Sequence, residues 1–333
     1  MSMKGPLTAR EVWAGIALLG GAGLGLAAAV QQVLTVRDRR RFAPPGVLVD
    51  VHGHQMHLLI SGPDGDGPAV ILEAGMGSFS PNWYWVQREL SDIRTVAYDR
   101  PGLGWSEPTG RPRDARTIAE DLRQAMTAAG IEPPFVLAGH SFGGLPVRAF
   151  ADVYPELTAG LVLVDASHPD QWARWPVRHA DRILAASQRL LSVLAWFGML
   201  RALDASRAIS NGLPAEQVAQ LRAASALPRC AATEAAQTKA WETSRNQLNA
   251  AAPLGELPLT VLAVTDQPVG GDLLTALQLE LAGLTANARF EVVDGASHES
   301  LVSQRRHARR VAAAIRSVVQ AAQDRQSSGS TTA

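Results

Sequence analysis

The chain has 333 residues, of which 47% are hydrophobic and 19% are charged, with 29 glycines and 20 prolines. This composition excludes a disordered chain, a collagen-like repeat and a coiled coil, and it predicts a globular protein with an ample core. Basic and acidic residues both number 31, so the formal net charge is zero and a nucleic-acid partner is not expected. Cys230 is the only cysteine, which excludes an intramolecular disulfide and a cysteine-based zinc site.

The N-terminal region, residues 1–43, is set apart by an apolar segment. The 25 residues from Val12 to Val36 carry no formal charge, and as a helix they would measure about 37 Å, enough for a tilted membrane span. We therefore expect a single-pass transmembrane anchor, and the arginines within Arg37–Arg41 favour a cytoplasmic main domain. Two alternatives remain open: a signal peptide that is cleaved on export, and a glycine- and alanine-rich helix that packs on the domain.

Short apolar runs in the rest of the chain predict eight β-strands, because they are often β-branched and are bounded by glycine, proline or aspartate. They are Val47–Val51, Met56–Ser61, Ala69–Ala74, Ile93–Tyr98, Phe135–Ala138, Gly160–Val164, Leu259–Thr265 and Arg289–Val293. Helical patterns lie at Pro81–Leu90, Ala115–Ala129, Gly143–Tyr154, Asp272–Leu284 and Glu299–Ala322. From Ala69 onward strands and helices alternate, which indicates parallel pairing, whereas the first two runs indicate a hairpin at the sheet edge. The expected fold is an α/β sheet of mostly parallel strands.

One long interval, residues 167–253, interrupts this alternation. It contains helix-like patches at Asp181–Trp196, Met199–Ile209, Ala215–Ala226 and Ala231–Leu248. An insertion of this length cannot be a plain loop, so we expect a helical lid that divides the core into residues 44–166 and 254–324. The polar tail, residues 325–333, is expected to be disordered. Because a lid presents an apolar underside to the cleft, candidate pocket residues are Trp172, Trp175, Trp196, Phe197 and Met199.

A serine in a glycine-rich turn carries the strongest chemical signal. Gly139-His140-Ser141-Phe142-Gly143 follows a buried strand and precedes a helix, which is the context that the G-x-S-x-G pattern requires. Small residues there allow a sharp turn that exposes the serine hydroxyl. A serine hydroxyl is a weak nucleophile and needs a general base. His298 lies where the last strand ends and the last helix begins, and it is the candidate base.

These motifs resemble the α/β-hydrolase superfamily, nearest to its lidded bacterial esterases, haloalkane dehalogenases and epoxide hydrolases. Two further runs carry the resemblance, Ala74–Gly77 and Asp99–Ser106, and it extends over residues 47–322. The resemblance implies a hydrolytic core with the lid, and neither cofactor nor metal. Dehalogenases and epoxide hydrolases of this fold use an aspartate nucleophile, so a serine favours acyl transfer. The family's usual His-Gly is replaced here by Ala74-Gly75.

The resemblance also implies the remaining catalytic groups. The backbone N–H groups of Met76 and Phe142 can form the oxyanion hole, since backbone donors do not depend on the side chain. The family usually places its acid after the penultimate strand, where this chain has Asp266, and some relatives place it after the sixth strand, where this chain has Asp165. We favour Asp266 and keep Asp165 as the alternative.

The expected function is therefore that of a serine hydrolase that cleaves carboxylic esters, small or lipid-like, through an acyl-enzyme on Ser141. An acyltransferase that uses the same triad and a non-catalytic binding protein on this fold are the alternatives.

Overall fold

The computed structural model describes residues 9–204, 206–264 and 270–330, without the side chains of residues 9–20, 329 and 330. Its centre is an eight-stranded sheet in the order β1-β2-β4-β3-β5-β6-β7-β8. The strands are β1 Val47–Val51, β2 His54–Ser61, β3 Ala69–Glu73, β4 Thr95–Tyr98, β5 Phe135–His140, β6 Thr158–Val164, β7 Leu259–Ala263 and β8 Ala288–Val292. The eight predicted strands are confirmed.

The pairing of the strands agrees with the sequence pattern. β1 pairs antiparallel with β2 and β2 with β4, whereas the remaining neighbours pair in parallel. Every residue of β3 and β5 is buried, because parallel strands in this architecture are covered by helices on both faces. The edge hairpin and the mostly parallel sheet are therefore confirmed.

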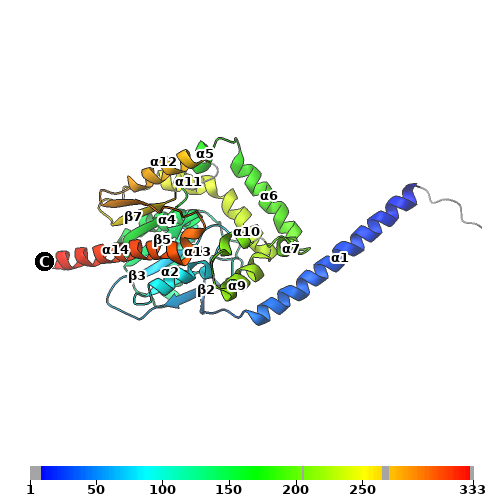
Figure 1. Cartoon of the computed structure of the whole chain (residues 1–333), viewed down its shortest axis with the longest axis horizontal. Helices are drawn as coiled ribbons and strands as arrows, with labels where there is room; N and C mark the ends of the chain where they lie inside the picture. Colours follow the sequence, from blue (N-terminus) through cyan, green and yellow to red (C-terminus); the bar gives the residue numbers. More distant parts are fainter. Residues whose placement is uncertain (1–8, 205, 265–269, 331–333) are drawn as a thin grey trace, which may run out of the picture.

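Helices form a layer on each face of the sheet (Figure 1). Helices α3 (Ala115–Ala128), α4 (Gly144–Val153) and α12 (Gly271–Ala282) contribute to the core of one face. Helices α2 (Tyr84–Glu89), α13 (Ser300–Ser303) and α14 (Arg305–Ser330) contribute to the core of the other. The last helix runs beyond the predicted end, so residues 325–330, expected in a disordered tail, are helical.

The described residues between β6 and β7 form helices and no strand, as predicted. The helices are α5 Gln171–Arg174, α6 Ala180–Ala195, α7 Met199–Ala202, α8 Arg207–Ser210, α9 Ala215–Ser225, α10 Pro228–Lys239 and α11 Trp241–Asn249. Gln188 of α6 and Thr238 of α10 approach the sulfur of Met76 to 3.4 and 3.5 Å. The insertion therefore reaches the loop that follows β3.

Helix α1 (Ala9–Arg41) extends away from the rest of the chain in Figure 1, and its C-terminal part contacts the helical insertion. Gln31 and Thr35 are buried, the Gln31 amide donates to Ala226 O at 3.0 Å, and Asp38 forms an ion pair with Arg201 at 2.6 Å. These contacts agree with the alternative of a helix that packs on the domain.

The transmembrane anchor predicted over Val12–Val36 lies partly outside the residues whose side chains are described, which begin at Gly21. Among the residues whose side chains are described, no helix is long and apolar enough to cross a membrane. Glycines 21, 23 and 25 and the polar pair Gln31-Gln32 interrupt the apolar run, and part of the segment is occupied in contacts with the insertion. The described part of the helix therefore does not support the single-pass anchor or the membrane localisation drawn from it.

Candidate active site

Ser141 occupies a strained turn between β5 and the helix α4. Its φ angle is +54°, a left-handed conformation that is uncommon for residues other than glycine and that recurs at functional sites. The flanking glycines have no room for a side chain: a Cβ on Gly139 would lie 2.5 Å from Gly143 O, and one on Gly144 would lie 2.5 Å from the Ala166 Cβ. The turn that the sequence predicted is therefore formed, and close packing maintains it.

We expect Gly143→Ala to destabilise the protein, because the added Cβ would lie 2.5 Å from the backbone oxygen of Glu73 and 2.8 Å from that of Ala74. Overpacking of this kind lowers the free energy of unfolding by about 1–3 kcal/mol, which thermal or urea unfolding would detect. Gly110→Ala is the matched control, since its Cβ would meet nothing within 4 Å. Equal stability of the two variants would contradict the packing argument.

His298 and Asp165 meet at the carboxyl edge of the sheet. The Nδ1 atom of His298 lies 2.5 Å from the Oδ2 atom of Asp165, whose side chain is 2% exposed while that of His298 is 36% exposed. Burial lowers the pKa of His298, but the hydrogen bond to Asp165 and the charges of Asp165 and Glu299 together raise it above 6.5. Asp165, like Ser141, has a positive φ angle, of +42°. The contact expected of the acid is thus made by the alternative candidate, and Asp266 lies outside the described residues.

His140, next to Ser141, links the turn to His298. Its ring lies 4.7 Å from the ring of His298, and its Nε2 atom is 3.0 Å from the His298 carbonyl oxygen. Because a carbonyl oxygen only accepts, Nε2 carries the hydrogen. Burial, followed by the nearby His298, lowers the pKa of His140 to about 3, so the ring stays neutral. His140 was not among the predicted site residues, although its place beside the serine was a signal.

The two backbone groups expected in the oxyanion hole flank Ser141. Phe142 follows it in the turn, and Gly75, which precedes Met76, packs so closely that a Cβ on it would lie 3.2 Å from the Ser141 Cβ. Among the hydrogen bonds of the described residues, none joins the Ser141 hydroxyl to His298. Catalytic hydrogen bonds are often long before substrate binds, and the structure brings the two residues together through His140.

The side chains expected to line a substrate pocket divide into two groups. Trp172 packs against Trp175 and Trp241, each at 5.7 Å between ring centroids, and Trp241 lies 6.1 Å from Phe142. The other three are Trp196, Phe197 and Met199, which lie where α6 ends and α7 begins. Trp196 follows Gln188, the α6 residue that contacts Met76, by eight positions, or about 12 Å along a helix. Ring contacts therefore connect the first group, through Trp241, to Phe142 in the serine turn.

Two charged residues beneath the Ala74–Gly77 loop did not emerge from the sequence. Glu73, at the end of β3, is fully buried, and the guanidinium of Arg100 is buried beside it as an ion pair. Burial raises the pKa of Glu73 to about 7, although the charge and hydrogen bonds of Arg100 oppose this shift. A glutamate that ends an otherwise apolar strand was the available signal.

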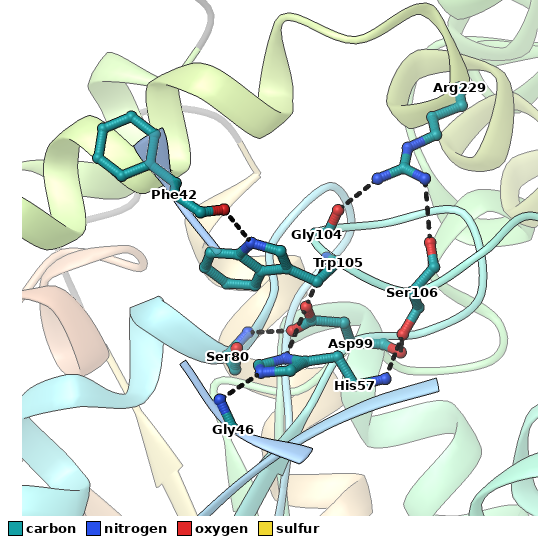
Figure 2. Close-up of polar contacts among 9 residues, drawn as sticks. All are labelled: Phe42, Gly46, His57, Ser80, Asp99, Gly104, Trp105, Ser106 and Arg229. Carbon is teal, nitrogen blue, oxygen red and sulfur yellow. Dashed lines mark hydrogen bonds and ion pairs between the residues drawn. The ribbon is translucent and has the colours of Figure 1, made fainter. Parts of the chain in front are cut away.

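A second buried histidine–aspartate pair consists of His57 and Asp99 (Figure 2). The two side chains are 0% exposed and 3.0 Å apart. The His57 Nε2 atom accepts the N–H of Gly46 at 3.1 Å, so Nδ1 carries the hydrogen that is shared with Asp99. Because both ring nitrogens are occupied and buried, this pair has a structural role.

Comparisons with known proteins agree with this architecture. A family model described as alpha/beta hydrolase fold matches residues 68–303. A probable transporter of Hormonema carpetanum is 34% identical over 139 residues, which cover 39% of this chain and 20% of the relative. An esterase from Thermogutta terrifontis has a TM-score of 0.61 at 21% identity, over 83% of this chain and 98% of that structure. The epoxide hydrolase CorEH has a TM-score of 0.62 at 20% identity, over 80% and 96%.

The chain spans less than half the length of each curated relative compared with it. The family model, by contrast, matches well over half of this chain, and it includes the strained serine turn and His298. The chain belongs to the alpha/beta hydrolase fold family.

Proposed function

We propose that the protein is a serine hydrolase that cleaves carboxylic esters, with Ser141 as nucleophile, His298 as general base and Asp165 as the acid. The 2.5 Å contact between His298 and Asp165 carries this proposal, because it fixes the imidazole beside the strained serine turn. Asp165, rather than the initially favoured Asp266, is the acid in this proposal.

The geometry supports a two-step acyl transfer. With its Nδ1 hydrogen bonded to Asp165, His298 leaves Nε2 free to accept the proton of the Ser141 hydroxyl. The serine oxygen then attacks the ester carbonyl, and the N–H groups of Met76 and Phe142 stabilise the oxyanion. The imidazolium returns its proton to the departing alcohol. Water, activated in the same way, releases the acid and restores the serine.

We also propose that α6 and α10 act as the lid of this site. Their residues Gln188 and Thr238 contact the Met76 side chain, and the two contact each other at 2.8 Å. Glu234 of α10 packs against Gly77 in the same loop, since a Cβ on Gly77 would lie only 2.6 Å from the Oε1 atom of Glu234. In this proposal the two helices cover the loop after β3, which carries the Met76 donor of the oxyanion hole.

The pH profile should follow the titration of His298. The base must be neutral, and its pKa is raised above 6.5, so kcat/KM should rise with pH through a midpoint above 6.5. His140 stays neutral over this range because its pKa is about 3. Hydrolysis rates from pH 5 to 9 measure the midpoint, and a midpoint below 6.5 would contradict the proposed role of Asp165.

The experiment that tests the function is a panel of p-nitrophenyl esters from acetate to palmitate, run beside a fluorophosphonate label. Hydrolysis of at least one ester together with labelling at Ser141 is the expected result. Addition of an alcohol acceptor identifies acyl transfer, since the product is then a new ester and not the free acid. Absence of both hydrolysis and labelling in folded protein would refute the proposal.

A further inference from the structure

The Arg100 guanidinium is built into the underside of the loop that leads to Met76. Its side chain is 2% exposed, and it donates from Nη1 to Ala74 O at 2.6 Å and from Nη2 to Gly75 O at 2.5 Å. Nη1 also contacts the Glu73 carboxylate. One side chain thus satisfies two consecutive carbonyl groups of the loop.

Gly75 O accepts two hydrogen bonds, the one from Arg100 and a longer one from the N–H of Ser78 at 3.2 Å, and the direction of this carbonyl determines which way the next N–H points. The Gly75 carbonyl and the Met76 N–H belong to one planar peptide unit, and in the trans form they point in opposite directions. With the carbonyl directed at Arg100, the Met76 N–H is directed away from it. Among the described residues this N–H has no hydrogen-bond partner. It is an unused donor in the loop whose Gly75 packs against Ser141.

Arg100 is itself held from both sides. Tyr98 donates to the other oxygen of Glu73, so β3 and β4 are tied together at their carboxyl ends. On the far side, the Asp99 carboxylate accepts the N–H groups of Ser80 and Trp105, both at 2.9 Å, and Ser106 Oγ donates to Asp99 O at 2.6 Å (Figure 2). The backbone around Arg100 is therefore fixed.

We propose that Arg100 is a positioning residue for the oxyanion hole, acting through the Gly75–Met76 peptide. It also lies 5.2 Å from the Phe142 ring, so it contacts both segments that supply the proposed donors. A cation on a carbonyl oxygen polarises the peptide and strengthens the N–H on its other side. This inference rests on the proposed function.

The arrangement requires a guanidinium and not only a positive charge. Arg100 uses two nitrogen atoms on two carbonyl groups, a fork that the single nitrogen of lysine cannot reproduce. Arg100→Lys should therefore lower kcat by about 10–100-fold with KM changed less than about twofold, since the lost stabilisation is made only in the transition state. Arg148→Lys is the matched control, because Arg148 is also buried but lies in α4.

Two ketones separate this role from a structural one. A trifluoromethyl ketone forms a tetrahedral adduct with the serine, and the oxygen of this adduct occupies the oxyanion hole. The matching methyl ketone binds without forming the adduct. Arg100→Lys should lower the affinity for the trifluoromethyl ketone by the same factor as kcat and leave the affinity for the methyl ketone unchanged. An unchanged kcat, or equal weakening of both ketones, would overturn the proposal.

A second variant keeps the test decisive if Arg100→Lys does not fold. Glu73→Gln retains the shape and the guanidinium but removes the charge that orients it, so a smaller loss with the same selectivity between the ketones is expected. Loss of both affinities together, or of neither, would again refute the role. A wild-type protein that neither hydrolyses esters nor takes the fluorophosphonate label would refute the proposed function instead.

Discussion

Ser141→Ala should abolish ester hydrolysis and fluorophosphonate labelling while the protein stays folded. In the proposed mechanism this hydroxyl forms the acyl-enzyme, and loss of a nucleophile of this kind lowers kcat by about 10⁴-fold or more. The strain at the turn gives a second expectation. Alanine, like serine, must adopt a φ angle of +54°, so the free energy of unfolding should change little. Labelling with mass detection and thermal unfolding measure the two effects.

Ser80→Ala is the matched control for this experiment. Ser80 is fully buried, and its hydroxyl has no hydrogen-bond partner among the described residues. The substitution removes a buried oxygen near the loop after β3 and leaves the proposed nucleophile in place. Full labelling should persist in this variant. If Ser141→Ala is labelled as fast as the wild type, the nucleophile lies elsewhere.

The sheet was predictable because its signal is local. Strands buried on both faces are apolar at nearly every position, as in β3 and β5, and a Gly-rich turn with a central serine stands between such a strand and a helix. Helix α1 was not predictable in the same way. Its glycine, alanine and leucine content suits both a membrane and a protein surface, and the contacts of Gln31 and Asp38 with the insertion join residues far apart in the sequence.

The polar network of the site depends on contacts between segments distant in sequence. Glu73 ends β3 and Arg100 lies in the loop after β4, 27 positions later, and nothing in either segment indicates that they pair. The identity of the acid is equally hard to predict. Because β6 and β7 are parallel neighbours, an aspartate that follows either strand lies at the carboxyl edge of the sheet. Sequence spacing cannot choose between Asp165 and Asp266, whereas the distance to His298 supports one of them.

Asp165→Asn should cost far more activity than Asp266→Asn. In the proposed mechanism the Asp165 carboxylate accepts the Nδ1 hydrogen of His298 and stabilises the imidazolium, whereas an asparagine keeps the shape but favours the wrong tautomer. We expect kcat to fall by about 10⁴-fold for Asp165→Asn, on the precedent of such replacements, and by less than about tenfold for Asp266→Asn.

The pH dependence supplies an independent reading of the same change. Asp165 contributes two of the three causes that raise the pKa of His298, and burial opposes them. In Asp165→Asn the burial remains while those two causes are lost, so the midpoint of the residual activity should move to lower pH. In Asp266→Asn it should stay where it is in the wild type. A large loss of kcat and a lower midpoint in Asp266→Asn, with Asp165→Asn near wild type, would reverse the assignment of the acid.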